Sequence, residues 1–170
     1  MSHLKDSLDP AFLRRQWRVQ RLGWLAMAAV VAATVLGLFG TSTLAYRVAR
    51  VEADGATYEV EYPRVTRYQH ADRLHLRVHA PGAAGDALRV AFSPSFVANA
   101  HVLSAFPEPD GGGAGPGGAV YEYKVEDWST TVVVTFEYES LKAFAWEGSI
   151  QVTAGDAAPV SLPLPQWVHP

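Results

Sequence analysis

The chain has no cysteine among its 170 residues. Disulfides, thiolate catalysis, zinc–thiolate and cysteine-ligated copper sites, and lipid attachment through cysteine are therefore excluded. Lysine is also scarce, because only Lys5, Lys124 and Lys142 accompany the arginines. A composition rich in alanine, glycine and arginine but poor in lysine and cysteine is typical of a bacterial protein with a high genomic GC content.

Charge is missing from one long stretch, since no charged residue lies between Arg21 and Arg47. A bilayer core about 30 Å thick needs roughly 20 apolar residues at 1.5 Å rise each, so we predict one transmembrane helix over residues 22–46. The apolar region of a cleaved signal peptide is shorter, about 7 to 15 residues, so the run is expected to be retained as a signal anchor. A cleaved signal peptide and a buried soluble helix are the alternatives.

Basic residues are concentrated before this run. The tail contains Lys5, Arg14, Arg15, Arg18 and Arg21, whereas Arg47 and Arg50 after the run are soon joined by Glu52 and Asp54. The positive-inside rule predicts a single-pass protein of the bacterial cytoplasmic membrane, with its N-terminus in the cytoplasm. Its parts are a basic tail with the start of an amphipathic helix (1–21), the span (22–46), a connector (47–55) and an extracytoplasmic domain (56–170).

Small residues recur every four positions along the predicted span. They are Ala29, Ala33, Gly37 and Thr41. Such a stripe lets two transmembrane helices approach closely, so these residues are candidates for packing against a partner helix. Alanine is frequent in this run, and a chance pattern is the alternative.

From residue 56 onward the hydrophobic pattern has a period of two. Residues 57–62 alternate apolar side chains with Glu59 and Glu61, and residues 73–79 alternate in the same way. Such alternation predicts strands with one buried face. The candidate strands are residues 57–62, 65–70, 73–79, 87–92, 96–106, 120–125, 131–139, 143–153 and 160–164.

Turn residues separate these strands, at Pro81–Gly82, Ser93–Pro94 and Gly155–Asp156 and in the glycine-rich loop 107–118. No segment after the predicted span has the helical period of 3.6. Short strands at regular spacing predict an all-β domain of about seven to nine strands. An immunoglobulin-like β-sandwich is the preferred architecture, and a small barrel is the alternative.

Motifs that carry catalysis are lacking. The glycine-rich loop has no G-K-[ST] ending for phosphate binding, and neither G-x-S-x-G nor S-x-x-K occurs. We therefore predict that the protein is not an enzyme and needs no cofactor. Residues 1–21 carry a net charge of about +3 within a total of −3, which leaves about −6 for residues 47–170. That balance argues against nucleic acid or anionic lipid as a partner of the outer domain.

Histidines are the only candidate metal ligands besides the acids. His75 and His79 share a strand face, but four residues of strand separate them by about 13 Å, too far for one metal ion. No metal site is predicted. A weak site that uses His70, His75 or His101 from different strands is the alternative.

Most aromatic side chains fall on predicted strands, Phe144 and Trp146 among them, and are expected to fill the sandwich core. Trp128 lies in a polar turn and Trp167 in the C-terminal tail. These two tryptophans are candidates for an exposed surface that meets a partner. The alternative for both is that they cover the end of the core.

Three stretches carry a resemblance to a known group of proteins: residues 55–64 after the anchor, residues 107–109 before the glycine-rich loop, and the terminal residues 166–170. They resemble small bacterial single-span membrane proteins with an uncharacterised outer domain. Such proteins are found alongside YetF-type polytopic membrane proteins. The resemblance implies partnership with a membrane protein and no chemistry, and it assigns no functional residue.

These observations lead to two functional hypotheses. The first is a membrane-anchored accessory protein whose β-sandwich binds or stabilises another membrane or envelope protein, without catalysis. The second is a membrane-tethered sensor or carrier domain that holds a small apolar or cationic molecule between its sheets.

Overall fold

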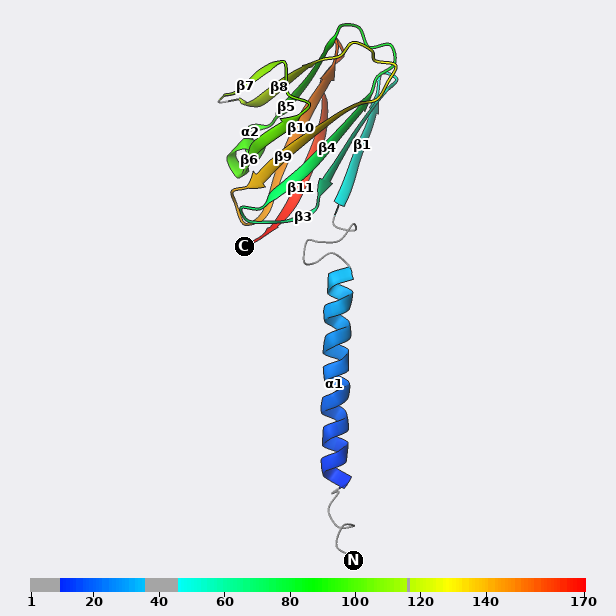
Figure 1. Cartoon of the computed structure of the whole chain (residues 1–170), viewed down its shortest axis with the longest axis vertical. Coiled ribbons are helices and arrows are strands. Elements are labelled where there is room, and N and C mark those ends of the chain that lie inside the picture. The colour runs from blue at the N-terminus through cyan, green and yellow to red at the C-terminus, as the bar shows by residue number, and fades with distance from the viewer. Residues whose placement is uncertain (1–9, 36–45, 116) are drawn as a thin grey trace, which may run out of the picture.

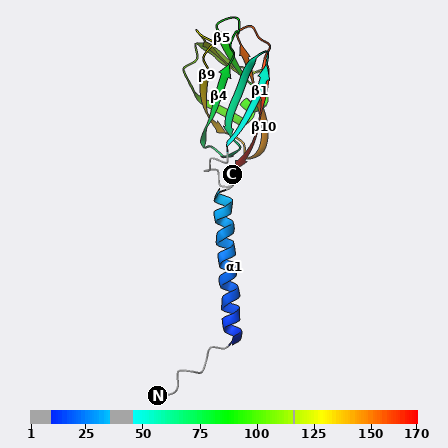
Figure 2. The same ribbon diagram turned by 90° about the vertical axis from the view of Figure 1, so that its right-hand side faces the viewer.

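The computed structural model describes residues 10–35, 46–115 and 117–170 of the chain. Within these residues the chain forms one long helix, α1 (Pro10–Val35), followed by a domain of eleven strands and one short helix. Figures 1 and 2 show α1 lying outside the domain, on the side where the first strand begins.

The domain consists of two stacked sheets. The first has the order β1-β2-β4-β9-β6, formed by β1 (Tyr46–Ala53), β2 (Ala56–Pro63), β4 (Ala71–His79), β9 (Val132–Ser140) and β6 (Ala100–Phe106). The second has the order β3-β11-β10-β5-β8-β7, formed by β3 (Val65–Arg67), β11 (Val160–His169), β10 (Phe144–Ala154), β5 (Ala87–Phe92), β8 (Gly118–Lys124) and β7 (Gly111–Gly115). The prediction of an all-β sandwich is confirmed.

Neighbouring strands are antiparallel, except that β3 runs parallel to the end of β11. Alternating side chains fill the space between the sheets, as Leu74, Leu76 and Val78 on β4 show by their complete burial. An aromatic cluster joins the two layers, because the ring centroid of Phe92 on β5 lies 5.0 Å from that of Phe136 on β9. The core thus sits between the sheets along their whole length.

The two ends of the sandwich are named here by their position relative to α1. The helix-side end contains the start of β1 at Tyr46, the end of β11 at His169 and the start of β10 at Phe144 (Figure 1). The far end contains the β1–β2 turn at Asp54 and Gly55 and the turn between β10 and β11. Residues distant in the sequence meet at each end.

The residues predicted as one strand from 96 to 106 form two elements. A short helix, α2 (Pro94–Asn99), precedes β6. Ser93 caps this helix, since its Oγ accepts a hydrogen bond from the backbone N–H of Phe96 at 3.3 Å, and Pro94 occupies the first turn, where no N–H is needed. The predictions of a continuous strand here and of no helix after the span are therefore wrong.

The segment predicted as a connector, residues 47–55, is mostly strand β1. It pairs with β2 through a two-residue turn, in which Asp54 and Gly55 both have positive φ values (53° and 77°), as a tight hairpin requires. The side chains of β1 that pack against the core are short and only partly buried, namely Ala49, Val51 and Ala53. The alternation is therefore weak, and this explains why the connector prediction was wrong.

The glycine-rich loop, residues 107–118, contains the edge strand β7, which pairs with β8. Gly112 has φ +128°, and a Cβ atom at this position would lie 2.1 Å from the carbonyl oxygen of Val120. Only glycine fits so close to the neighbouring backbone. The sequence predicts a loop over these residues, and the structure shows that residues 111–115 pair as an edge strand.

Among the described residues, no helix is both long and apolar enough to cross a membrane. The later part of the predicted span, residues 36–45, lies outside the described residues, and so do Gly37 and Thr41.

Gly148 on β10 provides a test of how α2 is seated. A Cβ atom here would lie 2.9 Å from Trp146 Cζ3 and 3.0 Å from Phe96 Cβ. We expect Gly148→Ala to lower the free energy of unfolding by about 1–3 kcal/mol, because the buried rings cannot move apart freely. The control Gly113→Ala has nothing within 4 Å of its added Cβ and should change this free energy by less than about 1 kcal/mol. Urea titration of the full chain in mild detergent measures both values, and equal small effects would contradict this packing.

Candidate functional site

A layer of polar side chains lies inside the helix-side end of the sandwich. Asp72 on β4 is the cross-strand partner of Tyr138 on β9, and Gln166 on β11 reaches across from the other sheet. The Gln166 side-chain amide donates hydrogen bonds to the Tyr138 hydroxyl and, at 3.3 Å, to the carbonyl oxygen of Pro63. Gln166 is only 4% exposed, so this layer closes the core with hydrogen bonds instead of apolar contacts.

Several polar atoms of this layer have no hydrogen-bond partner among the described residues. They are Asp72 Oδ2, Gln166 Oε1 and the indole Nε1 of Trp146. Burial raises the pKa of Asp72 to about 6, and the nearby His70 lowers it by a smaller amount. Burial also raises the pKa of the Tyr138 hydroxyl, whose bond with Gln166 opposes that change. The layer therefore holds a proton more tightly than an exposed carboxyl does, but it contains no activated nucleophile.

The predicted partner-surface residue Trp167 lies on β11, which continues past its predicted end at residue 164. Its side chain is 46% exposed and makes an edge-to-face contact with Phe144, at 6.4 Å between ring centroids. Phe144 is itself 60% exposed, so the expectation that it fills the core is wrong. Its φ of +73° turns the start of β10 out of the regular alternation. The pair forms an apolar patch on the outer surface.

The second predicted partner-surface residue, Trp128, is placed differently. It is only 8% exposed, and its indole Nε1 donates a hydrogen bond to the carbonyl oxygen of Gly85 at 2.8 Å. It covers the far end of the core, which was the alternative role for this residue. Of the two tryptophans, only Trp167 lies at an accessible surface.

The small-residue stripe is divided by the limits of the described residues. Ala29 and Ala33 lie on α1, whereas Gly37 and Thr41 lie outside the described residues. The large apolar side chains of α1 are each more than half exposed, from Trp17 to Val35. Nothing in the described part of the chain covers this helix in Figures 1 and 2.

The histidines of the domain are spread over its outer surface. His75 is hydrogen-bonded through Nδ1 to the hydroxyl of Thr135 at 2.9 Å. His101 lies opposite Glu139 in the register of β6 and β9. His70 lies in the turn before β4. Within residues 10–35, 46–115 and 117–170, no group of three or more histidine or acidic side chains is close enough to hold a metal ion.

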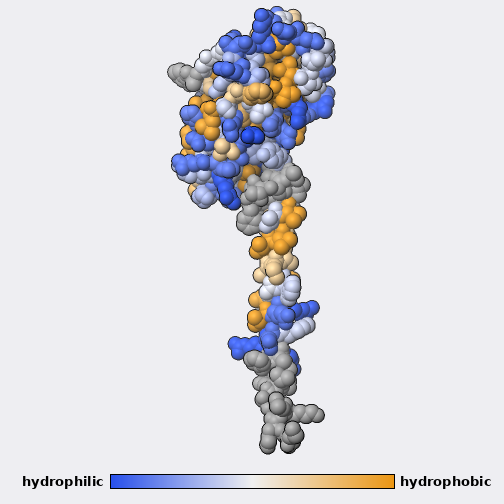
Figure 3. All heavy atoms as spheres, viewed as in Figure 1, coloured by the Kyte–Doolittle hydropathy of each residue, from blue (hydrophilic) through white to orange (hydrophobic). Residues whose placement is uncertain are grey.

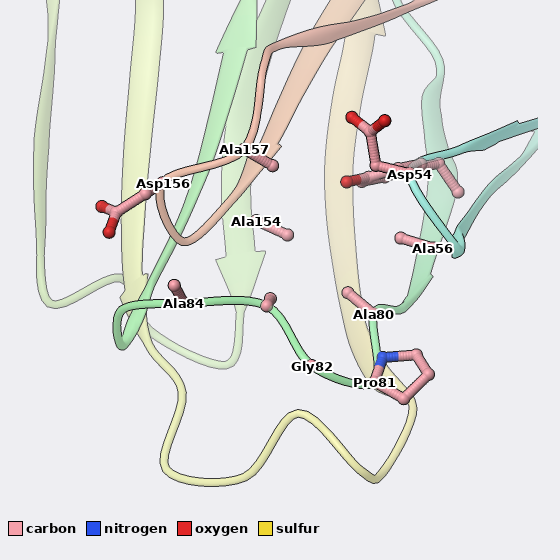
Figure 4. A pocket seen from close by; sticks show the side chains of 11 residues that line it. Asp54, Ala56, Ala80, Pro81, Gly82, Ala84, Ala154, Asp156 and Ala157 are labelled. Carbon is pink, nitrogen blue, oxygen red and sulfur yellow. The ribbon is translucent and has the colours of Figure 1, made fainter.

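A shallow hollow of about 290 Å³ opens between the sheets at the far end. Alanines from three turns line it, and Tyr58 forms part of its wall. Figure 4 shows Asp54 and Asp156 on opposite sides of the hollow, with Ala154 between them and Ala80 on the side of Asp54. Burial raises the pKa of Tyr58, and the charge of Asp54 adds to this effect. The hollow is apolar with an acidic rim.

Sequence reasoning missed three residues of these sites, namely Asp72, Gln166 and Phe144. A signal existed for Asp72, because it has the same strand parity as the buried Leu74 and must therefore face inward. None existed for Phe144, since its exposure depends on the backbone conformation at the start of β10.

Comparison of the chain with protein-family models and with curated proteins gives no match.

The raised pKa of Asp72 predicts how the free energy of unfolding depends on pH. Its pKa is raised in the folded state, so the unfolded chain loses this proton first as the pH rises from about 4 to about 6. The free energy of unfolding therefore falls as the pH rises through this window. The stabilising difference due to protonated Asp72 is fully present below about pH 4 and is lost above about pH 6. Asp72→Asn should remove this fall and raise the free energy of unfolding at pH 7 by about 1–2 kcal/mol, a discounted value because Asp72 is partly exposed.

The measurement is urea unfolding of the full chain in mild detergent at pH 4 and pH 7, followed by tryptophan fluorescence. The exposed Asp86→Asn serves as the control and should leave the difference between the two pH values unchanged. A pH dependence that is the same in Asp72→Asn and wild type would rule out this role for Asp72.

Proposed function

We propose that this protein is a single-pass protein of the bacterial cytoplasmic membrane, with its N-terminus in the cytoplasm and its β-sandwich outside. In this proposal the sandwich binds or stabilises another membrane or envelope protein without catalysing a reaction. The helix contributes to that contact through its small-residue stripe.

The observation that carries the proposal is the apolar surface of α1. The side chains of Leu22, Leu25, Val31 and the other large apolar residues of the helix are each more than half exposed. Figure 3 shows the apolar side chains on the part of α1 nearer the sandwich and the hydrophilic ones toward its start. An unpacked helix of this kind needs lipid or another helix to cover it.

The charge pattern supports the orientation. The basic side chains of α1 lie at its start, and the guanidinium of Arg21 lies over the ring of Trp17, 4.3 Å from the ring centroid. Arginine and tryptophan are the residues that favour a membrane–water interface. The proposal requires residues 36–45, which are also uncharged, to complete the span.

The strand order supports a binding module. The order β2-β4-β9-β6 in one sheet and β11-β10-β5 in the other corresponds to the A-B-E-D and G-F-C strands of an immunoglobulin-like sandwich. We therefore infer immunoglobulin-like topology, with β8 and β7 as added edge strands. Because a fold alone does not define function, this point supports binding only together with the uncovered helix.

The test is crosslinking of the tagged full-length protein in its native cells, followed by purification in mild detergent and mass spectrometry. We expect a stoichiometric membrane partner with the wild type and at least a fivefold loss of it in Ala33→Leu/Gly37→Leu, because leucine prevents close helix contact. The control Ala28→Leu/Ala32→Leu adds nearly the same bulk, one carbon less, on another face of the helix and should keep the partner. Recovery of the protein alone in every case would contradict the proposal.

The far-end hollow favours a second candidate function, the binding of a small apolar molecule with a cationic group. The alanine lining suits an alkyl chain, and Asp54 supplies a carboxylate at the rim. Tyr58 is the aromatic residue of this lining, while Phe92, Phe96, Tyr121 and Phe136 of the described core pack against one another.

Saturation-transfer NMR of the full chain in detergent, with butylammonium and butanol as probes, tests this candidate. Butylammonium should bind with an affinity in the millimolar range expected for so small a ligand, roughly tenfold more tightly than butanol. Asp54→Asn should abolish this preference. The turn should be kept, because asparagine tolerates the positive φ at this position. No transfer to either probe would rule the candidate out.

A further inference from the structure

The charged side chains of the sandwich are separated along its length. Five exposed acids gather at the far end: Asp54, Asp86, Glu126, Asp127 and Asp156. Lys124 is the basic residue of the described chain closest to them along the strands. The net negative charge of the domain, which argued against an anionic surface as partner, is therefore concentrated away from α1.

The helix-side end has the opposite character. Arg64 precedes β3, Arg67 is its last residue, and Lys142 lies between β9 and β10. All three side chains are exposed, and none forms an ion pair with another described residue. The acids on the strands toward this end are Glu61, Glu139 and Glu147, of which Glu61 is paired with Arg77. The carboxyl of Asp72 faces inward. This end is therefore locally basic.

The apolar patch of Phe144 and Trp167 lies beside these basic residues. The backbone N–H of Trp167 donates to the carbonyl oxygen of Arg64 at 2.9 Å, and Trp167 is paired with Val65 on β3. Phe144 is held exposed in the left-handed region, a conformation that is costly for a bulky side chain and often marks a functional surface. Tryptophan and phenylalanine beside arginine and lysine suit the boundary between lipid headgroups and acyl chains.

The path of the chain brings this end close to α1. Strand β1 begins at Tyr46, which pairs with Pro63 next to Arg64. Residues 36–45 join Tyr46 to α1 and can span at most about 35 Å even when fully extended. Any membrane that holds α1 is therefore within reach of this end, whereas the far end lies on the opposite side of the sandwich (Figure 1).

We propose that the helix-side end of the sandwich docks on the headgroup region of the membrane that holds α1. Phe144 and Trp167 enter the interface, and Arg64, Arg67 and Lys142 contact lipid phosphates. This inference rests on the proposed membrane anchor but not on the protein partner. Docking fixes the sandwich upright, with its acidic far end and the hollow turned toward the surroundings.

The experiment uses the full chain in liposomes of phosphatidylcholine and phosphatidylglycerol. Because the chain has no cysteine, a single introduced cysteine carries a fluorophore without background. One probe site is Ala145→Cys, beside Trp167, and the other is Thr130→Cys at the far end; both positions are exposed. A nitroxide on the lipid headgroups quenches only fluorophores close to the membrane surface.

Docking predicts at least threefold stronger quenching at Ala145→Cys than at Thr130→Cys. Phe144→Ser/Trp167→Ser should reduce it to the far-end level, and Arg64→Gln/Arg67→Gln should weaken it and remove its dependence on phosphatidylglycerol. The matched control is Leu103→Ser/Phe106→Ser, which removes two apolar side chains of β6 that are at least as exposed as Phe144 and Trp167 and should leave quenching unchanged. Equal, weak quenching at both probe sites would overturn the docking proposal.

Two further measurements separate the possible failures. Alkaline carbonate extraction of the same liposomes tests the anchor: a retained protein with unquenched probes refutes docking alone, whereas an extracted protein refutes the anchor and docking together. A photocrosslinker at Trp167 in native cells then identifies the contact. Adducts with lipid support docking, and adducts with a protein overturn it in favour of a protein partner at this patch.

Discussion

The structure depends on the burial of two apolar sheet faces against each other. The aromatic cluster of Phe92, Phe96 and Phe136 joins both sheets and the short helix α2, and Gly148 leaves the space that Phe96 needs. Inward positions along the central strands are filled in this way, as the complete burial of Leu74, Val90 and Ile150 shows. The candidate binding surfaces lie at the two ends of the sandwich.

The ends then acquire opposite characters. At the far end the turns carry acids around a small apolar hollow. At the helix-side end a polar layer closes the core, in which Gln166 is hydrogen-bonded to Tyr138 and Asp72 is the cross-strand neighbour of Tyr138. Outside that layer lie an aromatic patch and basic side chains that form no ion pair within the part of the chain that the structure describes. The two ends therefore differ in their position relative to α1. The basic and aromatic end lies on the side of the helix, and the acidic end lies away from it.

Much of the fold could be predicted because strand alternation is a local signal. Leu74, Leu76 and Val78 are spaced by two and are buried together, as expected. Predictions were wrong where the local pattern fitted more than one structure. Residues 94–99 form a helix that Ser93 caps, although they were predicted as strand. Strand β1 was predicted as a connector, because its inward side chains are short. The candidate sites were harder to predict, because one of two similar tryptophans is buried and the other is exposed.

The sequence by itself determined the long uncharged run, the period of two that makes the domain all-β, and the lack of cysteine and of catalytic motifs. Only the tertiary structure decided where charge and aromatic rings gather. Arg64, Lys142 and Trp167 are far apart in the chain and lie at the same end of the sandwich because β3 and β10 both pair with β11. Such pairing depends on the register between distant strands, which a local pattern does not encode.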